Sequence, residues 1–269
     1  ESWKRITRRV AIWAGSSLTF IALLFGVIAP KFHLEVPMWD PVISFEKEGF
    51  LLSTVLSFQS VIPPRPDGYS AKEANRMDSH ETEKPVNVIC IMNESFSDLR
   101  VLNGLTHETR GFETDEPFLT YYDSLSSMPN TQKGNLYVPV FGAMTANSEY
   151  EFLTGNSCAF VPQGSIPYQF YTKPGDNSLA KLFGKCGYTT IAMHPYPGYN
   201  WNRTEAYENL GFDAFLDQEF YDELEKEILE TGQGTSFSKP RNYMSDRSNY
   251  DSILHLLKEK EDGEKLFIF

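Results

Sequence analysis

The sequence predicts an α/β domain with a mainly parallel sheet flanked by helices, preceded by a transmembrane helix. Short apolar runs of strand length alternate with segments of helical spacing, which is the pattern of strands joined by helices. Residues 86–92 form a continuous apolar run, as expected of a parallel strand covered on both faces. Further strands are predicted at 136–141 and 188–194, and another begins at 266–269.

Helices are predicted between these strands, where apolar periodicity follows polar capping residues. The predicted helices cover residues 147–155, 177–185, 205–210, 218–231 and 246–260. Helices and strands of this spacing place the α/β domain at residues 85–269.

A transmembrane helix is predicted within residues 1–30. Residues 10–29 carry no charge, and twenty such residues cross a hydrocarbon core of roughly 30 Å. Four basic residues precede the run, and the positive-inside rule then places the N-terminus in the cytoplasm and the α/β domain outside. The alternative is a signal peptide, although the run is long for one and shows no obvious small-residue cleavage site.

Residues 31–84 are interpreted as an extracytoplasmic linker. An amphipathic helix is predicted at 45–61, lying near the membrane or packed on the next domain. A proline- and glycine-rich stretch ends it, and a short polar helix is predicted near 70–77. The chain begins at Glu1 rather than Met and stops within an apolar run, so we expect a fragment of a longer protein.

Composition limits the partners and the cofactors. The net charge of -12 argues against nucleic acid, which needs a basic surface. An acidic surface suits divalent cations, but solubility alone is the favoured interpretation of this charge. The three cysteines lack metal-type spacing. Cys90 lies in an apolar strand and is interpreted as a core residue, whereas Cys158 and Cys186 are compatible with free thiols or with a disulfide outside the cytoplasm.

Two candidate site residues stand at the ends of predicted elements. Glu94 follows the first strand, at the edge where parallel sheets bind ligands, and its carboxylate suits a cation. Thr145 opens a helix, where free N–H groups favour a phosphate and a metal-activated hydroxyl can attack phosphorus. A solvated loop acid and an ordinary N-cap remain open as alternatives.

A third group of candidates follows the strand at 188–194. His194 ends that strand, Arg203 offers a two-pronged contact to a phosphate, and Trp201 offers a face to a glycerol or a sugar. Structural roles for the three side chains are equally compatible with the sequence.

Three ordered segments, VNVICIMNESFSDL, FGAMTANSEYEFLTGNS and MHPYPGYNWNR, resemble the lipoteichoic acid synthase family of phosphoglycerol transferases. That family belongs to the sulfatase-like branch of the alkaline phosphatase superfamily. The resemblance implies that Glu94 and Thr145 bind one Mn²⁺ or another divalent cation such as Mg²⁺, and that Thr145 is the nucleophile. It also implies that His194, Trp201 and Arg203 line the head-group pocket.

The implied reaction has two steps on the outer face of the membrane. Thr145 takes glycerol phosphate from phosphatidylglycerol, and an envelope polymer or glycan hydroxyl then takes it from Thr145. The family's Asp-His pair, which completes the metal site, and its further histidine are not found up to Phe269. Asp246 and His255 lie in a predicted helix and are not taken as substitutes, so we expect this chain alone to be poorly active. Tyr196 stands where some relatives have an acidic residue, which leaves the contacts to the head group open.

Three other readings are kept. A phosphoethanolamine transferase shares the fold, metal and threonine, although the Trp-Asn-Arg segment favours phosphoglycerol. A sulfatase proper needs a Cys or Ser nucleophile in a C-x-P-x-R setting, which Cys158 lacks. A catalytically inactive, membrane-tethered relative that binds lipid head groups or envelope partners is the non-enzyme reading.

Overall fold

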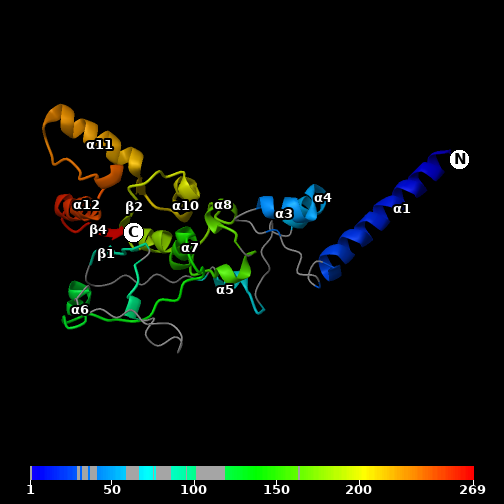
Figure 1. Cartoon of the computed structure of the whole chain (residues 1–269), viewed down its shortest axis with the longest axis horizontal. Coiled ribbons are helices and arrows are strands. Elements are labelled where there is room, and N and C mark those ends of the chain that lie inside the picture. The colour runs from blue at the N-terminus through cyan, green and yellow to red at the C-terminus, as the bar shows by residue number, and fades with distance from the viewer. Residues whose placement is uncertain are drawn as a thin grey trace.

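A four-stranded parallel sheet organises the C-terminal part of the chain (Figure 1). The strand order is β1 (Val88–Ile89), β4 (Lys265–Ile268), β2 (Tyr188–Met193) and β3 (Ala214–Leu216), and each neighbouring pair is parallel. The predicted α/β class is confirmed. This computed structural model describes residues 2–28, 31, 36, 41–58, 67–74, 76, 86–94, 96–100, 119–162 and 164–269.

Strand β4 is covered on both faces, and its residues alternate between them. The prediction of a strand at 86–92 covered on both faces is wrong: β1 is only Val88–Ile89, and Ile89 and Ile91 are exposed. Leu266 and Ile268 pack with Ile253 of α12 (Asp246–Glu259), while Phe267 points into a larger cluster on the opposite face. Successive strand residues face opposite sides, so one short apolar strand supplies both cores. This two-sided burial explains why the strand reads as a continuous apolar run.

The larger cluster is built by several helices that follow one another in the chain. They are α7 (Thr145–Thr154), α8 (Pro167–Phe170), α9 (Leu179–Lys185) and α10 (Arg203–Leu210). Side chains cap three helices of the domain: Ser178 caps α9, Asp217 caps α11 (Gln218–Thr231) and Ser245 caps α12. These caps satisfy N–H groups that would otherwise lack partners, and they explain why the predicted helix starts are close to those observed.

Some predicted elements differ from the structure. The predicted strand at 136–141 is wrong: the segment is irregular, Leu136, Tyr137 and Phe141 are exposed, and no described strand pairs with it. Strand β3 was not predicted because only three residues form it. The predicted helix at 45–61 is two helices, α3 (Pro41–Glu48) and α4 (Phe50–Ser57), separated by Gly49 at φ 81°; residues 59–61 lie outside the described part.

The N-terminal segment is helical from α1 (Ser2–Leu23) into a π-helical turn, η1 (Leu24–Ile28). It extends away from the sheet in Figure 1 and is almost entirely exposed. Trp3–Ile28 is long and apolar enough to cross a membrane, a test that a signal sequence would also meet. The polar helix near 70–77 is the short α5 (Ala71–Ala74), and the predicted domain boundaries at residues 30 and 84 lie outside the described residues.

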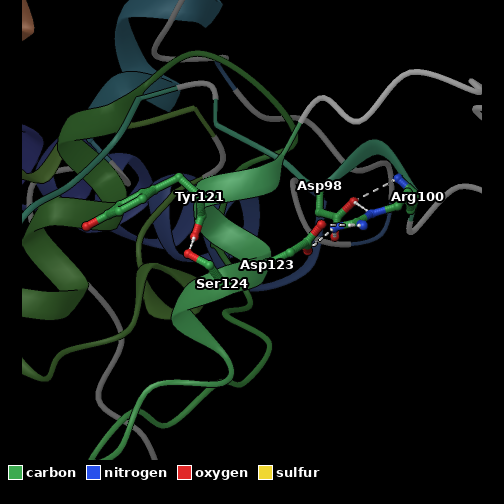
Figure 2. Close-up of polar contacts among 5 residues, drawn as sticks. All are labelled: Asp98, Arg100, Tyr121, Asp123 and Ser124. Carbon is green, nitrogen blue, oxygen red and sulfur yellow. Dashed lines mark hydrogen bonds and ion pairs between the residues drawn. The ribbon is translucent and has the colours of Figure 1, made fainter.

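A surface ion-pair cluster ties the segment after β1 to α6 (Thr120–Leu125), as Figure 2 shows. Arg100 donates to both oxygens of Asp98, at 2.7 and 2.8 Å, and to both oxygens of Asp123, at 2.8 and 3.0 Å. Exposed pairs of this kind contribute little to stability. Their effect is to orient the chain that leaves Glu94 relative to α6.

Candidate active site

The carboxyl ends of β1 and β2 open onto a cavity of about 940 Å³. Glu94 enters its lining from the segment after β1, and His194, Trp201 and Arg203 enter from the loop after β2 and the start of α10. Because β1 and β2 both flank β4 in a parallel sheet, their carboxyl ends lie at one edge. The structure therefore brings four of the five predicted site residues to one cavity.

Thr145 is not part of the lining of this cavity. Helix α7 begins at Thr145, as predicted, but the N-cap residue is Met144, so the capping alternative does not describe Thr145. Within the described part of the chain, the Thr145 hydroxyl has no hydrogen-bond partner. Glu149, one helical turn further on, lines a smaller cavity of about 80 Å³ together with Glu94 and His194.

A buried ion pair joins the helix of Thr145 to the helix of Arg203. The Arg203 side chain is 1% exposed and donates to the Glu149 carboxylate from Nη2 at 2.7 Å and from Nε at 3.2 Å. The Tyr207 hydroxyl donates to the same carboxylate at 2.9 Å. Burial alone lowers the pKa of Arg203, but the Glu149 carboxylate outweighs it and raises the pKa above its usual range. The guanidinium is therefore a permanent cation held in place by α7.

The two-pronged contact expected between Arg203 and a phosphate is made here to Glu149. The Nη2 atom of Arg203 also lies 3.8 Å from the carboxylate of Glu94, which is about half exposed. Glu94 and Arg203 both line the larger cavity. Arg203 thus connects the carboxylate at the end of β1 to the helix that carries Thr145.

His194 is held by the sheet and is partly buried beneath the loop that follows it. Its backbone N–H donates to the carbonyl of Leu216 at 3.0 Å, which continues the pairing of β2 with β3. Burial lowers the pKa of His194, and the nearby charge of Arg203 lowers it further. The imidazole is therefore neutral at pH 7, with one nitrogen that donates and one that accepts a hydrogen bond.

Backbone strain is concentrated around the site. Three pairs of consecutive non-glycine residues have left-handed φ angles between 50° and 66°: Ala143 with Met144, Trp201 with Asn202, and Arg241 with Asn242. The first pair precedes Thr145, the second presents Trp201, and the third precedes Tyr243, which lines the cavity. Such conformations cost on the order of 1–3 kcal/mol each and cluster at functional sites. The strain therefore marks all three segments as candidates for ligand contact.

Sequence reasoning missed three polar residues of this region. Glu149 and Tyr207 form the buried network with Arg203, and Asp246 lines the larger cavity from the first turn of α12. The spacing of Thr145 and Glu149 on one helix face was the available signal for the first. Asp246 follows no strand, so the strand-end rule had no means of finding it.

The described residues offer ligands of the type that the metal implied by the family resemblance prefers, but too few of them to hold it. Glu94 and Thr145 offer two oxygen donors, which suit a hard divalent cation. Among the described residues, however, no group of three or more His, Cys, Asp or Glu side chains is placed to hold a metal ion. Glu94 and Thr145 therefore remain candidate ligands, and the described residues do not complete a metal site.

The three thiols are free, and Cys158 lies away from the cavity of Glu94. Burial raises the pKa of Cys158 to about 12, with Glu151 adding to the effect. Its backbone N–H donates to the Glu151 carboxylate at 2.6 Å. These contacts give Cys158 a structural role at the end of α7.

Comparison with known proteins places this fold and site in a family. The sulfatase family profile matches residues 86–269. The chain belongs to the sulfatase family. Among its relatives, a Rhizobium meliloti protein named for cyclic β-1,2-glucan modification is 36% identical over 245 residues, covering 88% of this chain and 34% of that protein. A lipoteichoic acid synthase of Staphylococcus saprophyticus is 30% identical over 185 residues, covering 66% and 25%.

A solved structure of this fold is a phosphoglycerol transferase of Streptococcus pyogenes in complex with sn-glycerol-1-phosphate. It is 22% identical, with a TM-score of 0.53 over 77% of this chain and 52% of that one. The likeness supports the sulfatase-like arrangement of the parallel sheet. This sulfatase-family chain spans about a third of the length of its Rhizobium relative and a quarter of the lipoteichoic acid synthase.

Proposed function

We propose that the native protein is a membrane-anchored phosphoglycerol transferase of the sulfatase family. It would move glycerol phosphate from phosphatidylglycerol to an envelope polymer or glycan on the extracytoplasmic side. The observation that carries the proposal is the convergence of Glu94, His194, Trp201 and Arg203 on one cavity, with Arg203 paired to Glu149 on the helix that begins at Thr145. The likeness to a lipoteichoic acid synthase and to a glucan-modification protein supports an envelope substrate.

The proposed reaction passes through a covalent intermediate on Thr145. The Thr145 oxygen attacks phosphorus, the bond from phosphorus to the diacylglycerol oxygen breaks, and the threonine proton ends on diacylglycerol. An acceptor hydroxyl then attacks the same phosphorus, the bond to Thr145 breaks, and the acceptor proton returns to Thr145. Splitting one displacement into two in this way is the general advantage of nucleophilic catalysis.

The remaining residues position the head group. Arg203 supplies a fixed positive charge near the phosphate, which is most effective where water is excluded. Neutral His194 can exchange hydrogen bonds with the glycerol hydroxyls, and the Trp201 ring can cover the glycerol carbons. Because Glu149 already orients Arg203, little reorganisation is needed when the phosphate arrives.

A divalent cation, with Mn²⁺ as the first expectation, is proposed to complete the site. Glu94 and Thr145 would supply two of its ligands, and the others would come from outside the residues described here. When bound, such an ion neutralises phosphate charge and favours the ionised hydroxyl. Diacylglycerol release is measured in parallel with Mn²⁺ and with Mg²⁺, and the metal that gives the faster release is the preferred one.

The test is release of diacylglycerol by the native, membrane-purified protein. Thr145→Ala should reduce the rate at least about a hundredfold, because it removes the attacking oxygen, whereas Thr145→Ser should keep measurable activity. Thr231→Ala, at the exposed end of α11, is the matched control and should turn over like the wild type. Undiminished release by Thr145→Ala would contradict the assigned nucleophile, and preference for phosphatidylethanolamine would indicate the phosphoethanolamine reading.

A further inference from the structure

Three tyrosines that play no part in the proposed donor chemistry line the same cavity: Tyr196, Tyr199 and Tyr243. Tyr199 is 79% exposed and Tyr243 is 53% exposed. The rings of Tyr196 and Tyr243 lie 5.4 Å apart at an angle of 31°. We call Tyr196, Tyr199 and Tyr243 the tyrosine rim. Large aromatic surfaces left exposed around a concave site are a mark of ligand contact.

The cavity is larger than the proposed donor head group requires. Pockets of roughly 300–1,000 Å³ hold whole drug-sized molecules, and this one measures about 940 Å³. A glycerol phosphate is a small fraction of a ligand of that size. The cavity bounded by the described residues therefore has room for part of a second substrate beside Glu94 and Arg203.

The charge of the cavity lining favours a neutral acceptor over a phosphate-bearing one. Within the described lining, Arg203 is the one Lys or Arg side chain, and Glu94 and Asp246 are carboxylates. Arg203 is paired with Glu149, and in the proposed reaction its remaining charge faces the donor phosphate, so it does not serve a second phosphate at the tyrosine rim. Among the described lining residues, a polymer with a phosphate on every unit would meet carboxylates and no unpaired Lys or Arg, and like charges brought together are unfavourable. A neutral ligand meets no such penalty.

We propose that the tyrosine rim is the acceptor subsite and that it binds sugar rings of a neutral glycan. The apolar faces of sugar rings would stack on the tyrosine rings, which combine a large apolar surface with a polar hydroxyl. The side-chain amides of Gln169, Asn200 and Asn249 also line the cavity and suit sugar hydroxyls. The inference rests on the proposed function, because it names the acceptor of that reaction.

Direct binding tests the subsite without requiring turnover. Isothermal titration of the purified protein in detergent would use a short neutral β-glucan oligosaccharide and, as the charged alternative, a glycerol phosphate oligomer. We expect the glucan to bind more tightly than the oligomer. Tyr199→Ala and Tyr243→Ala should each weaken glucan binding about tenfold through the lost stacking surface. Tyr121→Ala is the matched control, since Tyr121 is 73% exposed on α6 and does not line the cavity.

Tighter binding of the glycerol phosphate oligomer, or unchanged glucan affinity in both rim variants, would overturn the inference. Equal losses in Tyr121→Ala would do so as well, since they would show that any exposed tyrosine matters. Failure of the proposed function is seen separately, as absent diacylglycerol release by the wild type with glucan binding intact. Circular dichroism of each variant shows whether a loss of binding reflects a loss of fold.

Discussion

At the scale of single residues, the buried pair of Arg203 and Glu149 is the contact on which the site depends most. Removing one partner leaves the other charge buried and unpaired, which typically costs about 3–5 kcal/mol. We expect Glu149→Gln to lower the free energy of unfolding by several kcal/mol, measured by urea denaturation. Tyr207→Phe, which removes one hydrogen bond to the same carboxylate, should cost only about 1–3 kcal/mol. A Glu149→Gln variant as stable as the wild type would contradict this role.

His194 should make stability depend on pH in a predictable direction. Burial lowers its pKa in the folded state below the usual 6.5, so the unfolded chain takes up the proton first as the pH falls. The stabilising contribution is fully present above about pH 6.5 and is lost as the pH falls through the folded pKa. Urea denaturation between about pH 7 and pH 5 should show a slope that His194→Gln flattens. His255→Gln, on exposed α12, is the control, and an equal flattening there would contradict the assignment to His194.

The five predicted site residues show which parts of the site can be predicted from the sequence and which cannot. His194 was found because the end of β2 can be read from its apolar run. Glu94 was found although the apolar run at 86–92 extends beyond β1, which ends at Ile89. Arg203 was found as well, but its partner Glu149 was not, because a carboxylate on a helix gives no sign of the charge that will face it. Asp246 was set aside for lack of a strand, since only the fold brings the start of α12 to the cavity.

At the scale of elements, the loop from His194 to α10 is fixed by a close backbone approach at Gly198. A Cβ there would lie 2.5 Å from Asp217 Oδ2 and from Thr204 Oγ1, and 3.0 Å from the Phe215 ring. Gly198→Ala must therefore displace the loop, and such overpacking typically costs about 1–3 kcal/mol. We expect a lower melting temperature and weaker glucan binding.

Gly134→Ala is the control for that substitution, because nothing lies within 4 Å of a Cβ at Gly134. It should leave the melting temperature and the glucan affinity unchanged. If Gly198→Ala behaved in the same way, the loop would be less constrained than its packing indicates.

The helices could be predicted more closely than the strands, and the reason is local. Helix starts can be predicted from capping side chains, which accept a hydrogen bond from a backbone N–H within the first turn. Three helices begin in this way, after Ser178, Asp217 and Ser245. Strand pairing depends on neighbours distant in sequence. The apolar run at 136–141 therefore resembled a strand although no described strand pairs with it, and three-residue β3 was too short to detect.

At the scale of the whole molecule, α1 and its π-helical end are separate from the sheet and almost entirely exposed (Figure 1). An apolar helix of this length is stable only when its surface is covered, and a bilayer covers all of it. We expect the chain to float with lipid vesicles in a density gradient and a variant lacking residues 2–28 to remain at the bottom. If that variant also floated, a segment other than residues 2–28 would anchor the chain to the membrane.

The central claim is that the Thr145 oxygen carries glycerol phosphate during the reaction. Mass spectrometry of the native protein after incubation with phosphatidylglycerol and Mn²⁺, in the absence of acceptor, tests this most directly. The account predicts a glycerol phosphate adduct on the peptide that contains Thr145, absent from Thr145→Ala and removed when a neutral glucan acceptor is added. Release of diacylglycerol with the adduct on another residue, or with no adduct when the reaction is quenched rapidly, would contradict it.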